Sequence, residues 1–176
     1  MVVRPAVEAD LPAVETLVDA FVAGHPAERE RRPPEVLGSA FFGPAPVAYL
    51  VVACIGPEIV GLGQWHRIYD LFWGKFGAEA GWLFVEPGRR GLGISAAILT
   101  EIAAEARDAG CEFLHGGADD PEIARLYARV AQSDGDFSWS GHVSGGAFSA
   151  LAALAGLPPR EIVRRLPQSD LGRVDI

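Results

Sequence analysis

Residues 82–95 read Trp-Leu-Phe-Val-Glu-Pro-Gly-Arg-Arg-Gly-Leu-Gly-Ile-Ser, and this stretch decides the fold. The apolar run that ends at Val85 predicts a strand, Pro87-Gly88 predicts a turn, and two further glycines precede a helical pattern. Glycines let the backbone approach a phosphate closely, and unpaired N–H groups at the start of a helix can hold its oxygens. The stretch therefore predicts a phosphate-binding loop between a strand and a helix.

The sequence on both sides of this loop predicts an α+β chain. Asp10 is a candidate N-cap for the first helix. The aromatic stretch 69–77 is expected to connect two strands. Apolar residues at helical spacing predict helices over 11–22, 35–42, 94–109, 121–130, 147–154 and 159–166, and β-rich runs predict strands over 2–4, 47–55, 59–68, 78–85, 111–114 and 137–143.

Length, charge and cysteine content limit the function classes. The 176 residues fit a single domain over 1–176, and the net charge of -8 disfavours nucleic-acid binding, which needs a basic face. Cys54 and Cys111 lack the spacing of a metal or disulfide motif, so no metal is expected. Neither a secretory signal nor an apolar run long enough for a membrane span is visible, so we expect a cytoplasmic protein without a membrane partner.

A dinucleotide site is the first alternative for the glycine loop. Gly91-x-Gly93-x-x-Ala96 matches the spacing of the dinucleotide fingerprint. That motif starts directly at the end of a strand and is followed by an acidic residue at the end of the next strand. Here residues 86–90 separate the strand from the first glycine, and the only acid of the next strand, Glu112, lies near its start. The pattern therefore disfavours a dinucleotide.

Two segments carry a family resemblance. Arg90-x-x-Gly93-x-Ser95 resembles motif A of the GNAT N-acetyltransferases, Arg/Gln-x-x-Gly-x-Gly/Ala, with serine where Gly or Ala is usual. Residues 120–129 are similar to motif B, Asn-x-x-Ala-x-x-Leu-Tyr-x-Lys. The Gly-Phe that normally follows is absent, and residues 133–176 form an atypical C-terminal portion, which could close the acceptor site or form the seam of a homodimer.

The resemblance implies a GNAT acyl-CoA N-acyltransferase fold, with a mixed central β-sheet that is flanked by helices and splayed to admit a pantetheine. It implies acetyl-CoA as co-substrate and transfer of the acetyl group to a primary amine of a small molecule or peptide, by direct attack in a ternary complex. The backbone N–H groups of Phe84 and Val85 would polarise the thioester carbonyl. The residues implied to hold the pyrophosphate are Arg90, Gly91, Leu92, Gly93, Ile94 and Ser95.

Three residues are candidates for proton transfer. Tyr127 lies where the family has a tyrosine that can protonate the leaving thiolate, although a tyrosine at that helical spacing also suits a core. Glu79 lies six residues before Val85, on the strand that leads into the loop, where the histone-acetylating branch of the family has a glutamate base. The alternative is that Glu79 is a solvent-exposed carboxylate at the end of a strand. His66 is the second candidate base, because imidazole titrates near neutrality, and packing is its alternative role.

Two further patterns in the sequence suggest a site. The cluster Trp65, Tyr69, Phe72, Trp73 and Phe76 could line an acceptor pocket, or pack in the core or in a dimer contact. The run 115–117, His-Gly-Gly, suggests a hydrolase oxyanion loop, but no Gly-x-Ser-x-Gly motif accompanies it, so that function is excluded.

Two rival functions use the same loop. A non-catalytic acyl-CoA-binding regulatory module would keep the phosphate site without the proton-transfer groups. A toxin that acetylates charged tRNA would need a basic groove, which the acidic charge disfavours.

Overall fold

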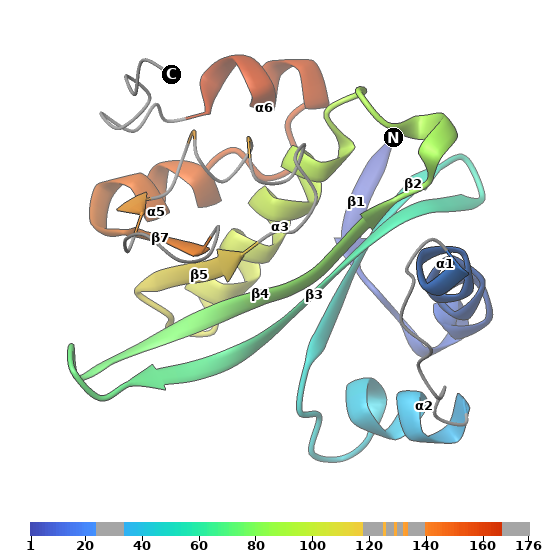
Figure 1. Cartoon of the computed structure of the whole chain (residues 1–176), viewed down its shortest axis with the longest axis horizontal. Helices are drawn as coiled ribbons and strands as arrows, with labels where there is room; N and C mark the ends of the chain where they lie inside the picture. The colour runs from blue at the N-terminus through green and yellow to red at the C-terminus, as the bar shows by residue number, and fades with distance from the viewer. Residues whose placement is uncertain (24–33, 118–124, 126–128, 130–131, 134–139, 167–176) are drawn as a thin grey trace.

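A computed structural model describes residues 1–23, 34–117, 125, 129, 132–133 and 140–166. In this part of the chain the strands form one seven-stranded sheet in the order β1-β2-β3-β4-β5-β7-β6 (Figure 1). β4 and β5 are parallel, and the other neighbouring strands are antiparallel. The strands are β1 (Val2–Pro5), β2 (Tyr49–Ile55), β3 (Glu58–Asp70), β4 (Lys75–Val85), β5 (Phe113–Gly117), β6 (Gln132–Ser133) and β7 (Ser140–Ser144).

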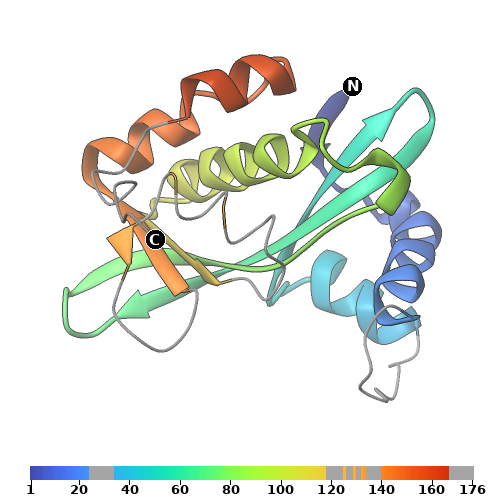
Figure 2. The ribbon, with the colours of Figure 1, turned by 45° about the horizontal axis from the view of Figure 1, so that its top comes forward.

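Helices cover both faces of the sheet, so the predicted α+β fold with a mixed sheet is confirmed. α1 (Leu11–Ala23) and α2 (Pro34–Phe42) lie on one face, which we call the α1 face. α3 (Ile94–Asp108), α5 (Gly145–Ala152) and α6 (Pro159–Arg165) lie on the other, the α3 face (Figure 2). No helix in the described ranges is long and apolar enough to cross a membrane.

Each face has its own apolar core because side chains alternate along the strands. In β2, Val51 and Ala53 are packed with α3 in the larger core, whereas Leu50 and Val52 are packed with α1 in the smaller one. Because β2 is buried on both faces, its sequence is apolar throughout. The sheet is therefore the middle layer of three.

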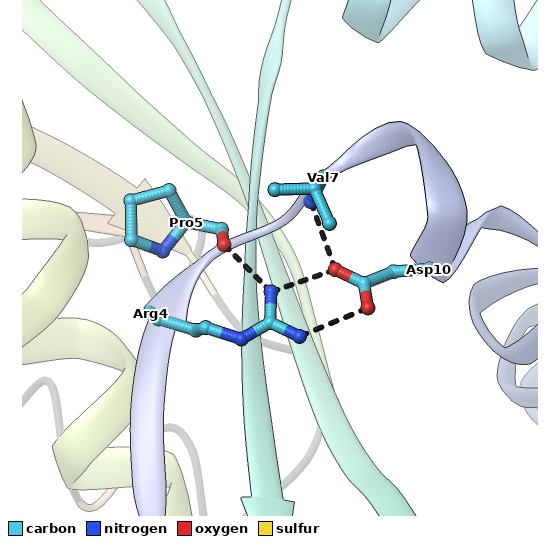
Figure 3. A network of polar contacts seen from close by, with 4 residues as sticks. All are labelled: Arg4, Pro5, Val7 and Asp10. Atoms are coloured by element: carbon cyan, nitrogen blue, oxygen red, sulfur yellow. Dashed lines mark hydrogen bonds and ion pairs between the residues drawn. The ribbon is translucent and has the colours of Figure 1, made fainter.

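The first turn of the chain is held by Arg4 and Asp10 rather than by a helix cap. Asp10 ends a short 3-10 helix, Glu8–Asp10, and its carboxylate accepts hydrogen bonds of 2.7 and 2.9 Å from the Arg4 guanidinium (Figure 3). The same carboxylate accepts a 2.8 Å bond from the Val7 N–H. The Asp10 side chain thus turns back toward β1 and joins it to the start of α1.

The aromatic connection predicted over 69–77 is largely strand, and that prediction was wrong. β3 continues to Asp70 and β4 begins at Lys75, since aromatic residues such as Tyr69 and Phe76 favour extended backbone. Gly74 supplies a left-handed residue with a φ of 66°, and the Trp73 N–H donates a 2.7 Å bond to the Asp70 carboxylate. The two strands therefore form a long arm with a tight tip.

The C-terminal elements follow the sequence only in part. The strand expected over 137–143 is present as β7, which lies between β5 and β6. The two small helices expected over 147–154 and 159–166 are α5 and α6. The helix expected over 121–130 lies outside the described residues, apart from Arg125 and Arg129, which are helical.

Candidate functional site

The candidate site lies where β4 separates from β5. β4 pairs with β5 only from Ala78 to Ala80, but it pairs with β3 as far as Val85. The register with β3 shifts between Gly63 and Trp65, which bends the strand at this point. Between residue 81 and Val85, β4 is paired with β3 alone among the residues that the structure describes. This separation gives β4 an open edge of backbone polar groups.

The direction of these backbone groups distinguishes the two residues expected to polarise a carbonyl. The Glu86 N–H donates a 3.0 Å bond to the Val60 carbonyl on β3. Since backbone groups alternate in direction along a strand, the polar groups of Phe84 also face β3 and those of Val85 face the open edge. The Val85 carbonyl there accepts a 3.1 Å bond from Arg90 Nε. Val85 is therefore better placed than Phe84 to bind a ligand through its backbone.

The glycine loop forms the start of α3. Gly91 has a φ of 73° and Gly93, the N-cap of α3, a φ of 78°, so both adopt the left-handed conformation that favours glycine. The first bond within the helix runs from the Ala97 N–H to the Gly93 carbonyl. The N–H groups of residues 94–96 therefore have no acceptor within the helix, and no side chain caps them from position 93.

The electrostatics of the loop suit an anion. The positive end of the α3 dipole lies at residues 93–95, and no acidic side chain occupies the first turn of the helix. Arg90 adds a positive charge to the loop, and its guanidinium lies 5.9 Å from the ring centroid of Phe84. Leu92 is exposed and Ile94 is buried, so the backbone of the loop rather than their side chains would meet a phosphate.

Helix α6 lies against this loop. A Cβ built on Gly93 would be 3.0 Å from the Pro159 Cβ and 3.2 Å from the Val163 Cγ2. Arg129 Nη2 donates a 2.8 Å hydrogen bond to the Val163 carbonyl on the same helix. The atypical C-terminal portion thus packs on the loop that carries the motif, and Gly93 is required there for packing as well as for its backbone conformation.

A carboxylate and an imidazole meet on the α1 face, one pair before the last pairing of β4 with β5. Glu79 on β4 is opposite His115 on β5, and Glu79 Oε2 forms a hydrogen bond with His115 Nδ1. The neighbouring Ala78 and Ala80 are in the α3-face core, so the Glu79 side chain points the other way. The two side chains are 29% and 34% exposed, and they can therefore meet a ligand.

His66 belongs to the same row of residues across the sheet. It is the β3 partner of Glu79, as His115 is the β5 partner. The two candidate bases are therefore neighbours on one face, which the sequence alone did not indicate. His115 was missed because its pairing with Glu79 depends on the parallel register of β4 and β5. The signal was the histidine at the end of the strand that follows α3.

The other predicted site residues divide. Tyr127 lies outside the described residues. Trp65 is 2% exposed in the α3-face core, where it stacks on Tyr49 at 4.5 Å. Trp73 packs edge-on against Phe113 at 5.4 Å, whereas Phe72 at the arm tip is 92% exposed. The predicted aromatic cluster therefore does not line one pocket. The described part of the chain has no group of three metal-ligating side chains.

Comparison with known proteins supports the same fold. Residues 14–131 match the family model described as the acetyltransferase (GNAT) family. An aminoglycoside acetyltransferase, meta-AAC0020, from an uncultured soil metagenomic sample, in complex with sisomicin, has a TM-score of 0.63 at 20% identity, with 77% of this chain and 91% of that chain covered. No curated protein sequence matches the chain significantly.

Two further solved structures have the same fold. A transcriptional regulator from Bacillus halodurans C-125 has a TM-score of 0.64 at 25% identity and covers 77% of this chain and 94% of its own. A ribosomal-protein-alanine N-acetyltransferase from Brucella melitensis biovar Abortus 2308 has a TM-score of 0.63 at 18% identity, with coverage of 78% and 96%. The family model spans most of the strands and the whole glycine loop, and on this evidence the chain belongs to the GNAT acetyltransferase family.

Proposed function

We propose that this protein is an acetyl-CoA-dependent N-acetyltransferase that acetylates a primary amine of a small molecule or peptide by direct attack in a ternary complex. The proposal rests on one observation: the open edge of β4 runs between the glycine loop and the pair Glu79 and His115. The glycine loop lies at one end of this edge, and Glu79 with His115 lies at the other, on the α1 face. A thioester bound along the edge would have its phosphates at the loop and its acetyl group near the carboxylate.

The loop would bind acetyl-CoA through its pyrophosphate. The N–H groups of residues 94–96 and the guanidinium of Arg90 are the donors, and the space beside Gly91 is open, because no atom of the described residues lies within 4 Å of a Cβ built there. Ser95 adds a hydroxyl at the position where the family has a smaller residue. These donors fit a diphosphate and need no metal to hold it.

The chemical step needs three contributions from the chain. The Val85 N–H polarises the thioester carbonyl, a base removes a proton from the ammonium group, and an acid protonates the departing thiolate. Glu79 is the proposed base and His66 the second candidate, while Tyr127 is the proposed acid. The amine nitrogen then attacks the carbonyl carbon, the C–N bond forms and the C–S bond breaks.

A charge-reversal pair in the loop tests the assignment. Ser95→Glu places a carboxylate beside the proposed pyrophosphate, whereas Ser95→Gln has the same size without the charge. An acidic residue in the first turn stabilises a helix, so the glutamate variant should remain folded. We expect calorimetry with acetyl-CoA to show at least tenfold weaker binding for the glutamate variant than for the glutamine variant, with NAD and plain CoA as controls. Equal affinities would remove the loop from the acetyl-CoA site.

The identity of the acceptor is open to a direct screen. The solved acetyltransferases of this fold include one described as an aminoglycoside acetyltransferase and one as a ribosomal-protein-alanine N-acetyltransferase. Thiol release from acetyl-CoA should therefore be followed with sisomicin and with a peptide that begins with alanine. The protein described as a transcriptional regulator favours one rival, a regulatory module. Binding of acetyl-CoA without thiol release for any amine is the result that this rival predicts.

A further inference from the structure

The contact between Glu79 and His115 joins two strands that run in parallel. The two residues are paired in register, and a hydrogen bond between Glu79 Oε2 and His115 Nδ1 joins their side chains. They also form the next-to-last pair before β4 separates from β5, since Ala80 opposite Gly116 is the final pair. The pair therefore lies at the inner end of the open edge.

The positions nearest the pair along the two strands carry no titratable side chain. Along the strands, the positions two residues away are Gly77 and Gly81 on β4, and Phe113 and Gly117 on β5, none of which titrates. Across the sheet, His66 on β3 is the register partner of Glu79, and His142 on β7 is the register partner of His115.

We infer that Glu79 and His115 act as one proton-accepting unit for the amine, with His115 as a residue that no motif in the sequence assigns. The inference rests on the proposed function and refines it. A carboxylate that accepts the Nδ1 proton of an imidazole fixes the tautomer of the ring and stabilises its protonated form. The carboxylate and the ring therefore act together, and the proton taken from the acceptor is shared between them.

The proton balance follows from this unit. The acceptor arrives as an ammonium group, and one of its protons passes to the pair, which leaves a neutral amine. The nitrogen attacks the thioester carbonyl, the C–N bond forms and the C–S bond breaks. A second nitrogen proton is lost as the thiolate gains one, so the products are an amide and a thiol. The pair then releases its proton to water and is ready for the next amine.

The first test needs no enzymatic activity. The sequence has four histidines, so long-range proton–nitrogen spectra of the histidine-labelled protein resolve each ring, and single His→Asn variants assign them. We expect the wild-type His115 ring to carry its proton on Nδ1, and its titration midpoint to fall by about one pH unit in Glu79→Gln. An unchanged tautomer and midpoint in Glu79→Gln would overturn the inference.

The second test separates a shared function from independent effects. The pH profile of kcat/KM is measured by thiol release from acetyl-CoA, with sisomicin, an alanine-terminated peptide and water as acceptors. We expect Glu79→Gln and His115→Asn each to lower kcat/KM by about 10- to 100-fold, and the double variant to lose no more than the worse single variant. The acidic limb of the profile should move in both single variants.

Two comparisons make the result specific. His66→Asn combined with His115→Asn should multiply the two single effects, because β4 lies between these two residues in the sheet. A purely structural role for His115 predicts lower stability with an unmoved acidic limb, which would also overturn the inference. Failure of wild type to bind acetyl-CoA in calorimetry would instead remove the proposed function, while the spectra still decide whether the pair shares a proton.

Discussion

The indole Nε1 of Trp65 donates a 2.7 Å hydrogen bond to Oε2 of Glu105, which ties β3 to α3. The other carboxylate oxygen of Glu105 is buried and accepts no hydrogen bond within the described ranges. Burial is the main cause that raises the pKa of Glu105; the bond from Trp65 lowers it and the nearby Glu101 raises it. The fold therefore favours the protonated acid at this position.

Replacement of Glu105 by glutamine should stabilise the protein. For a raised pKa, the stabilising contribution is complete below the unfolded value and is lost as the pH rises through the folded value. Glutamine still accepts the bond from Trp65 and carries no charge. We expect the free energy of unfolding in urea at pH 8 to rise by about 0.5–1 kcal/mol, a range that allows for solvent screening, and to change little at pH 4. Glu112→Gln, at an exposed site, is the control, and a less stable Glu105→Gln at pH 8 would contradict the argument.

Asp10 should give the opposite pH dependence. The hydrogen bonds from Arg4 lower the pKa of Asp10, with help from the Val7 N–H. A lowered pKa contributes stability above the unfolded value, and this contribution is lost as the pH falls through the folded value. Asp10→Asn should therefore cost about 1 kcal/mol at pH 7 and less at pH 2, measured by chemical unfolding. Glu8→Gln in the same turn is the matched control, and an equal cost at low pH would show that the charge is not the cause.

Gly77 and Gly81 lie on one strand and should respond differently to alanine. A Cβ on Gly77 would be 2.2 Å from the ring of Phe113, whereas the nearest atom to a Cβ on Gly81 is at 3.8 Å. Gly77→Ala should therefore lower the free energy of unfolding by about 1–3 kcal/mol, and Gly81→Ala by much less. Phe113→Leu removes the ring, so it should reduce the penalty of the first substitution in the double variant. Equal effects of the two alanines would place Phe113 elsewhere.

Gly91 and Gly93 form a second matched pair, within the loop itself. Both have a positive φ, so alanine at either should cost about 1 kcal/mol from the backbone alone. Only at Gly93 does the new Cβ meet α6, through Pro159 and Val163. We expect the larger loss of stability in Gly93→Ala, by thermal or urea unfolding. If both variants lose the same amount, α6 does not rest on the loop.

The contact between α6 and the loop also decides which substitution can test the acetyl-CoA site. A bulky residue at Gly93, such as tryptophan, would block the loop. The structure places α6 where that side chain would go, so the substitution would displace a helix as well as block a phosphate. The charge pair at Ser95 is the cleaner probe.

The sequence predicts those parts of the site whose residues are contiguous, and it misses those that join residues far apart in the chain. The glycine loop was found because strand, turn and helix start are contiguous, and each has a local cause in proline, glycine or apolar spacing. The pairing of Glu79 with His115 was not found, because parallel strands are joined by a long crossover and their register is not written locally. The contact between Pro159 and Gly93 was missed because it joins two residues that are far apart in the sequence.

The arm formed by β3 and β4 shows a different limit. Its aromatic residues favour strand as strongly as any in the chain, yet glycines among them suggested a connection. A glycine in a strand and a glycine in a turn look alike in sequence. Only the neighbour, such as Phe113 over Gly77, reveals which role it has.

The contact between α6 and the loop provides a position for a fluorescent reporter of ligand binding. Arg160 is exposed and follows Pro159 directly, so a fluorophore joined to a cysteine at that position would stand beside the loop without entering it. Cys111 is buried and Cys54 partly so, which favours selective labelling of the new thiol. A ligand that binds the loop would change the surroundings of the dye. Binding could then be measured as a change in fluorescence before any acceptor is known.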